Sequence, residues 1–383
     1  MSSADTQYET PSTELAVYGH GGGTVWLAVC LAAALCFLCL PAYRRLRACC
    51  CGRAARHDGV EVTAFANHKG GVGKTTIALM CAKRLAEADA ANNVLLVDCS
   101  LFGDLTRRCG VSQVPREKTI EAFAERAAAN SAWSRRWCCC SSSTDPTTAF
   151  VCGASGFPNL FVLSSAAQQH NAASGSEHSI DPGAVPATAA GLRAMLAADF
   201  MATGRRWTVI ADTDGGLSHA MTKLALCLAD TVTVPVNADP DDEIRMRVLL
   251  NLLAKLRAAK LSVAEVGGAF FNKLPVKNNS PDEPALLAGL PFAISPAHLN
   301  AVSKLRSGFA AAADEFPGLF PTFAATAATE AGNFFSGVRS GGVGLERAKE
   351  DLKAELSEGV RGDVDGLVEQ IRLGLSMKRK LHF

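Results

Sequence analysis

The sequence has almost no excess of either charge and very little tyrosine. Its 38 lysines and arginines nearly balance 37 aspartates and glutamates, which leaves a formal net charge of +1 over 383 residues. Binding to nucleic acid through the overall field needs a clear positive excess, so the net charge does not support nonspecific DNA binding. The three tyrosines all precede residue 44, which excludes a C-terminal tyrosine cluster.

The 14 cysteines lack the spacing of a disulfide framework. Six of them form two triplets, Cys49 to Cys51 and Cys138 to Cys140, and others lie in apolar runs. This usage indicates a reducing compartment for the main domain. A metal site at either triplet stays open as an alternative, although neither has a neighbouring C-x-x-C pair or suitably spaced histidine.

Residues 1–22 contain no lysine or arginine and are predicted to form a short, non-cytosolic, disordered tail. Residues 23–41 follow without a single charge. A helix of this length spans roughly 27 Å at 1.5 Å per residue, just enough for a hydrocarbon core of about 30 Å. The segment is therefore predicted to be a single transmembrane helix, with the lipid bilayer as a partner.

Five arginines lie between residues 44 and 56, and none precedes the apolar segment. The positive-inside rule then predicts a single-pass membrane protein whose main domain is cytosolic. A targeting segment, or a soluble protein with a buried leader, remains an alternative. Residues 42–59 form a basic, cysteine-rich juxtamembrane linker, where Cys49 to Cys51 are either S-acylated or ordinary free thiols.

From residue 60 onward, strand-like and helix-like runs alternate. This pattern predicts an α/β fold with a doubly wound, mostly parallel sheet and helices on both faces, over residues 60–383. A variable insertion is expected at 131–185, interrupted by a strand near 159–163, and C-terminal helices at 345–383. The apolar run 319–323 is predicted to be the last, edge strand.

The strongest motif follows the first of these strands, at residues 67–76. Glycines 70, 71 and 73 allow successive N–H groups to turn onto phosphate oxygens, and the following helix adds its positive end. Lys74 is placed to reach the β- and γ-phosphates, and Thr75 offers a hydroxyl to Mg²⁺. His68 occupies the position where the P-loop pattern has its first glycine. The next residue, Lys69, is a second lysine that the general pattern does not have. The predicted binding residues are Lys69, Gly70, Gly71, Val72, Gly73, Lys74, Thr75 and Thr76.

This string resembles the deviant Walker A box of the ParA/MinD family of P-loop ATPases, in the SIMIBI class. The resemblance implies that the chain binds ATP and Mg²⁺, forms a homodimer through sandwiched ATP, and hydrolyses ATP. It also implies a role in partitioning or positioning cargo, with an activating or cargo protein as partner. In the family the early lysine, here Lys69, reaches the ATP of the partner subunit. Catalytic roles are expected for Lys69, Lys74 and Asp98.

Two further strands end in carboxylates. Asp98 ends the apolar run 93–98, and Asp212 ends the run 207–211 like a Walker B aspartate. Because ligands of open α/β sheets bind at the carboxyl ends of strands, Asp98 and Asp212 are expected to join Thr75 at the metal. Gly215 and the adjacent Asp214 depart from the family's D-x-P-P. Relatives also place an adenine-reading asparagine where Asn272 ends a later strand, although the same residue could simply cap that strand.

Ser100 stands where the family has the second aspartate of its switch I segment, the one that orients the attacking water. Hydrolysis is therefore expected to be slow, and Ser100→Asp is expected to speed it unless Asp98 or Asp104 already orients the water. An alternative is a nucleotide-binding scaffold with slow or no turnover, and a less favoured one is a P-loop tyrosine kinase, which would need the missing tyrosine cluster. The apolar stripe at 367–375 predicts a helix packed on the core or, alternatively, a membrane-binding helix.

Overall fold

The computed structural model describes residues 58–100, 103–111, 114–129, 152–153, 156–165, 180–237, 239, 241–274, 296–320, 335–339 and 357–380. All of them lie within the unit Ala55–Phe383. The predicted tail 1–22, the membrane helix 23–41, nearly all of the linker 42–59 and most of the insertion 131–185 lie outside the described residues, as do both cysteine triplets. No helix in the described part of the chain combines the length and apolarity needed to cross a membrane.

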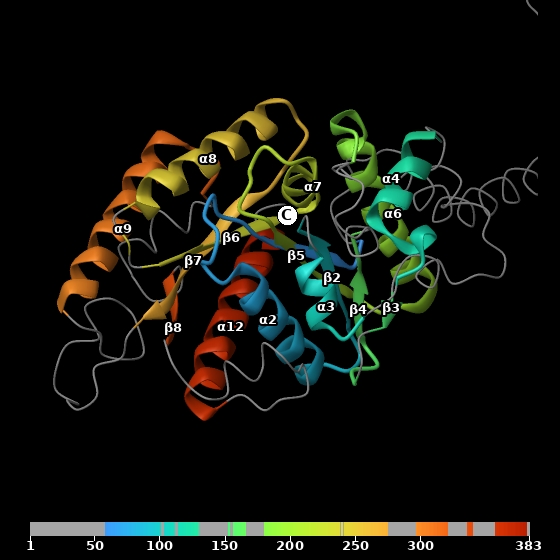
Figure 1. The fold of residues 1–383 in the computed structure, drawn as a ribbon, viewed down its shortest axis with the longest axis horizontal. Helices are drawn as coiled ribbons and strands as arrows, with labels where there is room; N and C mark the ends of the chain where they lie inside the picture. Colours follow the sequence, from blue (N-terminus) through green and yellow to red (C-terminus); the bar gives the residue numbers. More distant parts are fainter. Residues whose placement is uncertain are drawn as a thin grey trace, which may run out of the picture. The chain divides into compact units, whose positions relative to one another are not determined.

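Within these residues, eight strands form one sheet in the order β3-β4-β2-β5-β1-β6-β7-β8 (Figure 1). Neighbouring strands are parallel except for β3 with β4, so the predicted, mostly parallel sheet is confirmed. The strands are β1 (Val60–Phe65), β2 (Asn93–Cys99), β3 (Cys152–Gly153), β4 (Leu160–Leu163), β5 (Trp207–Thr213), β6 (Thr231–Val236), β7 (Glu265–Leu274) and β8 (Phe335–Arg339).

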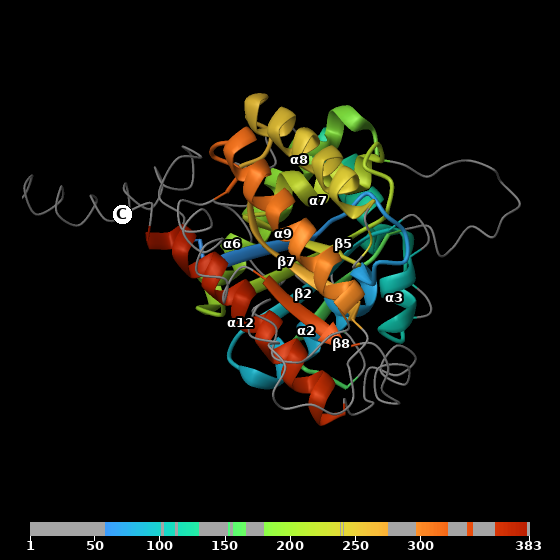
Figure 2. The same cartoon turned by 90° about the vertical axis from the view of Figure 1, so that its left-hand side faces the viewer.

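Helices cover both faces of this sheet (Figure 2). The helices are α2 (Lys74–Ala88), α3 (Asp104–Arg108), α4 (Ile120–Ala129), α6 (Val185–Thr203), α7 (Ala220–Leu228), α8 (Asp242–Ala258), α9 (Pro296–Glu315) and α12 (Glu358–Lys380), with short 3₁₀ turns at Arg116–Lys118 and Pro182–Ala184. Long helical segments between parallel strands are what a crossover connection requires. The doubly wound prediction is therefore confirmed.

Successive strand side chains point to opposite faces, which divides the apolar residues between two cores. Leu95 and Val97 of β2 belong to the larger core, beneath α4, α6, α7, α8 and α9. Val94 and Leu96 of the same strand belong to the smaller core, which α2 and α12 cover. Because β2 is buried on both faces, its sequence from Val94 to Val97 is continuously apolar rather than alternating.

The arrangement brings the loops after β1, β2 and β5 to one edge of the sheet. β5 lies between β1 and β2, and Asp212 is in register with both Phe65 and Asp98. The glycine loop and the two predicted carboxylates thus meet at the carboxyl ends of three adjacent strands, as predicted for an open α/β sheet.

The prediction of an edge strand at 319–323 was wrong for its described part. Leu319 and Phe320 lie in a turn, with only an isolated bridge from Phe320 to Pro317. Leu319 is buried, and its carbonyl accepts a hydrogen bond from the N–H of Val266 at 2.7 Å. Its apolar character therefore reflects burial beside the start of β7. The strand that pairs with β7 is β8.

The C-terminal helix α12 packs on the core, in agreement with the first of the two alternatives. Val360, Val364 and Leu367 are buried against α2, and Figure 2 shows the two helices side by side on one face of the sheet. Arg84 of α2 pairs with Asp365 of α12 through two hydrogen bonds, of 2.7 and 3.0 Å. The buried apolar stripe of this helix is thus occupied within the domain.

Candidate functional site

The loop between β1 and α2 has the backbone that its glycines predict. Gly71 and Gly73 have φ angles of 71° and 88°, in the left-handed region that glycine adopts without steric cost. Gly73 also has no room for a side chain, since a Cβ would lie 2.0 Å from Nδ2 of Asn272. α2 begins directly afterwards at Lys74, so the loop ends at a helix N-terminus, where N–H groups are free for an anion.

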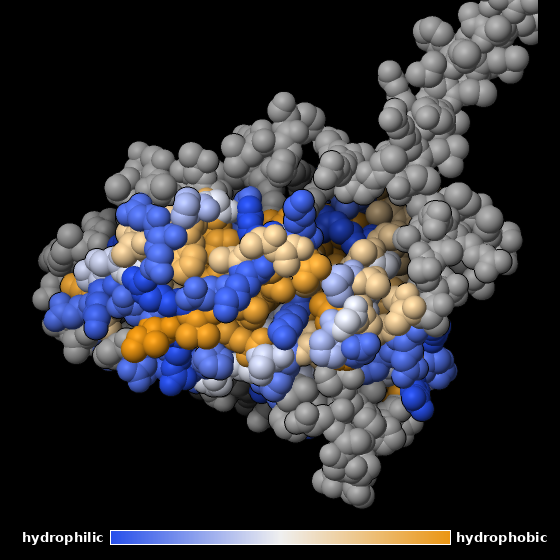
Figure 3. Space-filling view, turned by 90° about the horizontal axis from the view of Figure 1, so that it is seen from above, coloured by the Kyte–Doolittle hydropathy of each residue, from blue (hydrophilic) through white to orange (hydrophobic). Residues whose placement is uncertain are grey.

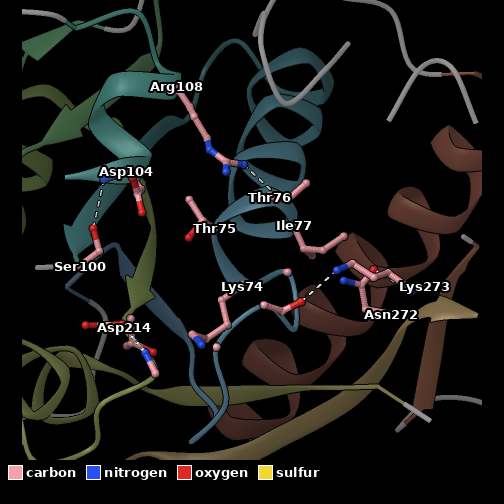
Figure 4. A pocket seen from close by; sticks show the side chains of 15 residues that line it. Lys74, Thr75, Thr76, Ile77, Ser100, Asp104, Arg108, Asp214, Asn272 and Lys273 are labelled. Carbon is pink, nitrogen blue, oxygen red and sulfur yellow. Dashed lines mark hydrogen bonds between the residues drawn. The ribbon is translucent and has the colours of Figure 1, made fainter. Parts of the chain in front are cut away.

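A pocket of about 360 Å³ opens beside this loop (Figure 4). Its lining comes from the glycine loop, the start of α2, the α3 segment, the end of β5 and the end of β7. The lining residues are Gly70, Gly71, Gly73, Lys74, Thr75, Thr76, Ile77, Ser100, Asp104, Arg108, Thr213, Asp214, Gly215, Asn272 and Lys273. Of the predicted site residues, those outside this lining are Lys69, Val72, Asp98 and Asp212.

Lys74 is buried and turned into its own loop. Its ammonium donates to the backbone carbonyl of Lys69 at 2.7 Å. Burial lowers the pKa of Lys74, while the nearby carboxylates of Asp212 and Asp214 act in the opposite direction. A phosphate in the pocket would supply the negative charge that this buried ammonium needs.

Asp212 is fully buried, and neither carboxylate oxygen has a hydrogen bond of ordinary geometry. Burial raises the pKa of Asp212 to about 8, and the neighbouring Asp98 adds to the rise, although Thr75 is close enough to lower it. A buried, unsatisfied carboxylate is costly, and a cation on that carboxylate would remove the cost. Thr75 and Asp212 therefore fit the hard oxygen-ligand set that Mg²⁺ takes in proteins.

Asp98 is committed to its own segment. One oxygen accepts bonds from the backbone N–H and the hydroxyl of Ser100, at 3.1 and 2.6 Å, and the other accepts from the N–H and hydroxyl of Thr106, at 2.8 and 2.6 Å. Burial raises the pKa of Asp98, against these four bonds. In this conformation Asp98 anchors the segment after β2, and its catalytic and metal-binding roles stay predictions.

Lys69 is held within its own subunit. Its ammonium contacts Asp239 at 2.7 Å and Asp242 at 2.8 Å, at the start of α8. Burial opposes the charged form, but the two carboxylates outweigh it and raise the pKa of Lys69. Reaching a partner subunit would therefore require Lys69 to leave both carboxylates.

The side chain of Asn272, which was expected to read adenine, is bonded to the protein's own backbone. Its amide nitrogen donates to the carbonyl of Val72, and its amide oxygen accepts the N–H of Lys273 at 2.9 Å. Lys273 has a φ of 57°, unusual for a residue with a side chain, and its ammonium donates to the carbonyl of Gly71 at 3.0 Å. The end of β7 therefore stabilises the glycine loop through hydrogen bonds from Asn272 and Lys273. Adenine recognition by Asn272 stays a prediction.

Two charged residues of the lining, Arg108 and Asp104, come from α3. Sequence reasoning missed Arg108 and considered Asp104 only as an alternative group to orient the water. Arg108 donates to the Thr76 hydroxyl at 3.0 Å, and Figure 4 shows it reaching from α3 across the pocket to α2. Asp104 begins α3 and pairs with Arg107. Their place in the chain, just after Asp98, was the only signal, because an arginine on a short helix has no motif of its own.

Comparisons with known proteins agree with this architecture. A family model described as an AAA domain matches residues 60–142, which include the glycine loop and β2. Among curated proteins, none matches the chain.

Two solved structures of McdA from Cyanothece are similar in fold. For apo McdA the TM-score is 0.55 and the sequence identity 14%, with 82% of this chain and 99% of that chain covered. For a complex of a McdA point variant with ATP the TM-score is 0.55 and the identity 14%, with 83% and 97% covered. At this identity the similarity concerns the fold alone: the chain shares the α/β fold of these McdA structures.

Proposed function

We propose that the chain is an ATPase of the ParA/MinD type, a membrane-anchored switch that dimerises around ATP. The observation that carries the proposal is the meeting of Lys74, Thr75 and the unsatisfied Asp212 at the glycine loop. A buried ammonium beside a helix N-terminus suits a triphosphate. The ATP found in the McdA complex of similar fold supports the same ligand class.

Thr75 and Asp212 are the residues that would hold Mg²⁺, which would neutralise charge on the phosphate oxygens as the bond to the γ-phosphoryl group breaks. Lys74 would lie against the β- and γ-phosphates, and the N–H groups of the glycine loop would bind their remaining oxygens. Phosphoryl transfer depends mostly on such positioning and electrostatics, which this loop is built to supply.

The proposed dimerisation depends on Lys69. Its ammonium contacts Asp239 and Asp242 and not the glycine loop. Asp242, at the start of α8, pairs with Lys69. The same end of α8 has two exposed apolar side chains, Ile244 and Val248, which are 66% and 43% exposed. They lie one helical turn apart and so share one side of α8. Figure 3 shows hydrophobic residues among hydrophilic ones on the face above the sheet. A second copy packed here would bury this apolar pair while receiving Lys69.

The anchor at 23–41 would hold the domain at the cytosolic side of a membrane, and the switch would act on an activating or cargo protein. Such a protein would distinguish the ATP-bound dimer from the monomer. The chemistry of the pocket does not identify this partner.

A second candidate function, a nucleotide-holding scaffold, is favoured by one contact. The hydroxyl of Ser100 is bonded to Asp98, so the segment after β2 offers no free carboxylate where ParA/MinD relatives have one. A chain that binds ATP and hydrolyses it slowly or not at all would act through the presence or absence of its ATP-bound dimer.

The deciding experiment combines ATP turnover with size analysis of the full chain in detergent, in ADP, in ATP and in a non-hydrolysable analogue. The proposal expects hydrolysis together with an ATP-dependent dimer. Binding and dimerisation without turnover would favour the scaffold, and absence of nucleotide binding would refute both.

A further inference from the structure

The pocket needs a group that orients the attacking water, and the residues near Asp98 are already occupied. Ser100 donates its hydroxyl to Asp98 at 2.6 Å, and the same oxygen accepts the N–H of Asp104 at 3.2 Å. Both oxygens of Asp98 have two donors each. Within the described lining, the carboxylates that remain are those of Asp104 and Asp214.

Asp214 stands at the tip of β5, two residues beyond Asp212. Lys74 and Asp214 line the same pocket, and the charge of Asp214 opposes the lowering of the Lys74 pKa by burial. Figure 4 places the two side chains on the same side of the pocket. Asp104 lies on another wall, at the start of α3, where its half-buried carboxylate pairs with Arg107.

Each oxygen of the Asp214 carboxylate has a close neighbour. One oxygen accepts the N–H of Gly215 at 2.5 Å, and the other lies 3.4 Å from Nδ1 of His219, the residue that precedes α7. The ring of His219 lies over Gly216, where a Cβ would come within 2.4 Å of the ring. Only a glycine at 216 therefore lets the imidazole approach this carboxylate.

The same segment is fixed directly to the glycine loop. The carbonyl of Gly215 lies 3.0 Å from Nδ1 of His68, the residue that replaces the first glycine of the P-loop pattern. A Cβ at Gly215 would lie 3.1 Å from the backbone nitrogen of Gly70. The departure from the general P-loop pattern at His68 is thus in contact with the departure from the family's D-x-P-P at 214–215.

We propose that Asp214 is the carboxylate that orients the attacking water, in place of the aspartate missing at Ser100, and that His219 positions Asp214. The inference rests on the proposed ATPase function. In the reaction the water oxygen bonds to the γ-phosphorus as the bond from that phosphorus to the β,γ-bridging oxygen breaks. The bonding pair leaves with ADP and both water protons end on phosphate, so that ATP⁴⁻ and H₂O give ADP³⁻ and H₂PO₄⁻. Asp214 accepts a hydrogen bond from the water and is unchanged at the end.

The test is single-turnover hydrolysis with parallel ATP titration, on the full chain in detergent. Water orientation of this kind contributes about 10²- to 10⁴-fold, so Asp214→Asn should slow hydrolysis by at least about 10²-fold. The same variant should bind ATP as tightly as the wild type or more tightly, because it removes a negative charge next to the triphosphate. Retained ATP binding also reports that the variant is folded.

Asp104→Asn tests the other carboxylate of the lining, and the inference requires it to slow hydrolysis less than Asp214→Asn does. Asp314→Asn, the same change at an exposed aspartate of α9, is the matched control and should hydrolyse within about 3-fold of the wild type. For the positioning residue, His219→Ala should slow hydrolysis by about 10-fold at unchanged ATP affinity. His219→Asn, whose amide can replace Nδ1, should recover most of that loss.

Three outcomes overturn the inference, and they differ in what else they affect. If Asp214→Asn hydrolyses ATP as fast as the wild type, or if Asp104→Asn is the slow variant, the inference fails while the ATPase function stands. If the wild type binds ATP but never hydrolyses it, the scaffold function replaces both. If the wild type binds no ATP, the proposed function fails as well.

Discussion

The side-chain amide of Asn272 donates a hydrogen bond to the backbone carbonyl of Val72, 2.7 Å away, although the two residues are 200 positions apart in the chain. The bond is buried, and it joins the end of β7 to the middle of the glycine loop. Asn272 therefore acts first on the shape of the loop.

Replacing Asn272 with alanine should weaken binding of ATP, ADP and GTP to a similar extent. Loss of one hydrogen bond costs about 0.5–1.5 kcal/mol, which is about 2- to 13-fold in affinity. Titration with the three nucleotides measures this, with Asn251→Ala on the exposed side of α8 as the control. A loss confined to ATP and ADP would instead support the adenine-reading role.

Lys69→Ala should weaken the ATP-bound dimer and leave the ATP affinity of the monomer within a few-fold, because Lys69 pairs with Asp239 and Asp242 and not with the pocket. Lys74→Ala should lose nucleotide binding itself, since Lys74 lines the pocket. Sedimentation and ATP titration of the two variants test this pair of expectations. Equal loss of ATP binding in both would place Lys69 in the site of its own subunit.

Asp212→Asn should stabilise the free protein at alkaline pH while abolishing Mg²⁺-dependent hydrolysis. Burial raises the pKa of Asp212 from 3.8 to about 8, so the folded state favours the protonated carboxyl. The stabilisation from that preference is complete below about pH 4 and is lost as the pH rises through about 8. Asparagine avoids this loss.

Thermal unfolding in EDTA at pH 5.5 and pH 8.5 measures the effect. A gain of about 1 kcal/mol corresponds to about 1–2 °C for a domain of about 320 residues, and the difference between variant and wild type should grow from the lower to the higher pH. A gain that is independent of pH would show that titration of Asp212 does not govern stability.

Ser100→Ala should change stability more than rate. The variant removes two buried hydrogen bonds, one to Asp98 and one from Asp104, at a cost of about 1–3 kcal/mol in the free energy of unfolding. Single-turnover hydrolysis should stay within a few-fold of the wild type, since the hydroxyl already donates its hydrogen bond to Asp98.

The structure also changes the outcome expected for Ser100→Asp, which the sequence alone predicts to be faster. A carboxylate at 100 would face the carboxylate of Asp98 across the present 2.6 Å contact, so we now expect no gain. Faster hydrolysis by Ser100→Asp in the same assay would count against the arrangement of this segment described above.

The orientation of the chain in its membrane is a separate prediction, and it concerns residues outside the described ranges. The arginines after residue 43 should keep the main domain cytosolic. In sealed vesicles of cytosolic-side-in orientation, added protease should spare residues 60–383, and detergent should remove that protection. Digestion without detergent would refute the orientation.

Much of the fold could be predicted because its signals are local. Mostly apolar runs located β1, β2, β4, β5 and β7, and glycine spacing located the loop at 70–73. The strand prediction at 319–323 failed because Leu319 is an apolar residue of a buried turn. Local hydropathy cannot distinguish a buried turn from a strand.

The site was harder to predict, because its remaining contacts join distant segments. Nothing near Asn272 in the sequence indicates Val72, and nothing near His68 indicates Gly215. Asp214 stood out only as a departure from the family pattern. Its significance depends on the imidazole of His219 and on Lys74 across the pocket, both of which need the packed chain to be seen.

The ion pair between Arg84 and Asp365 bears on how the protein is made. The helix that starts at the glycine loop shares its core with α12, so that core cannot close until the ribosome has synthesised the chain at least as far as Ile371. Contacts of such long sequence separation slow folding and leave apolar surface exposed in the meantime. The nascent chain thus has a nucleotide-binding loop long before it has the support beneath it, and nucleotide binding should be a late event in its biogenesis.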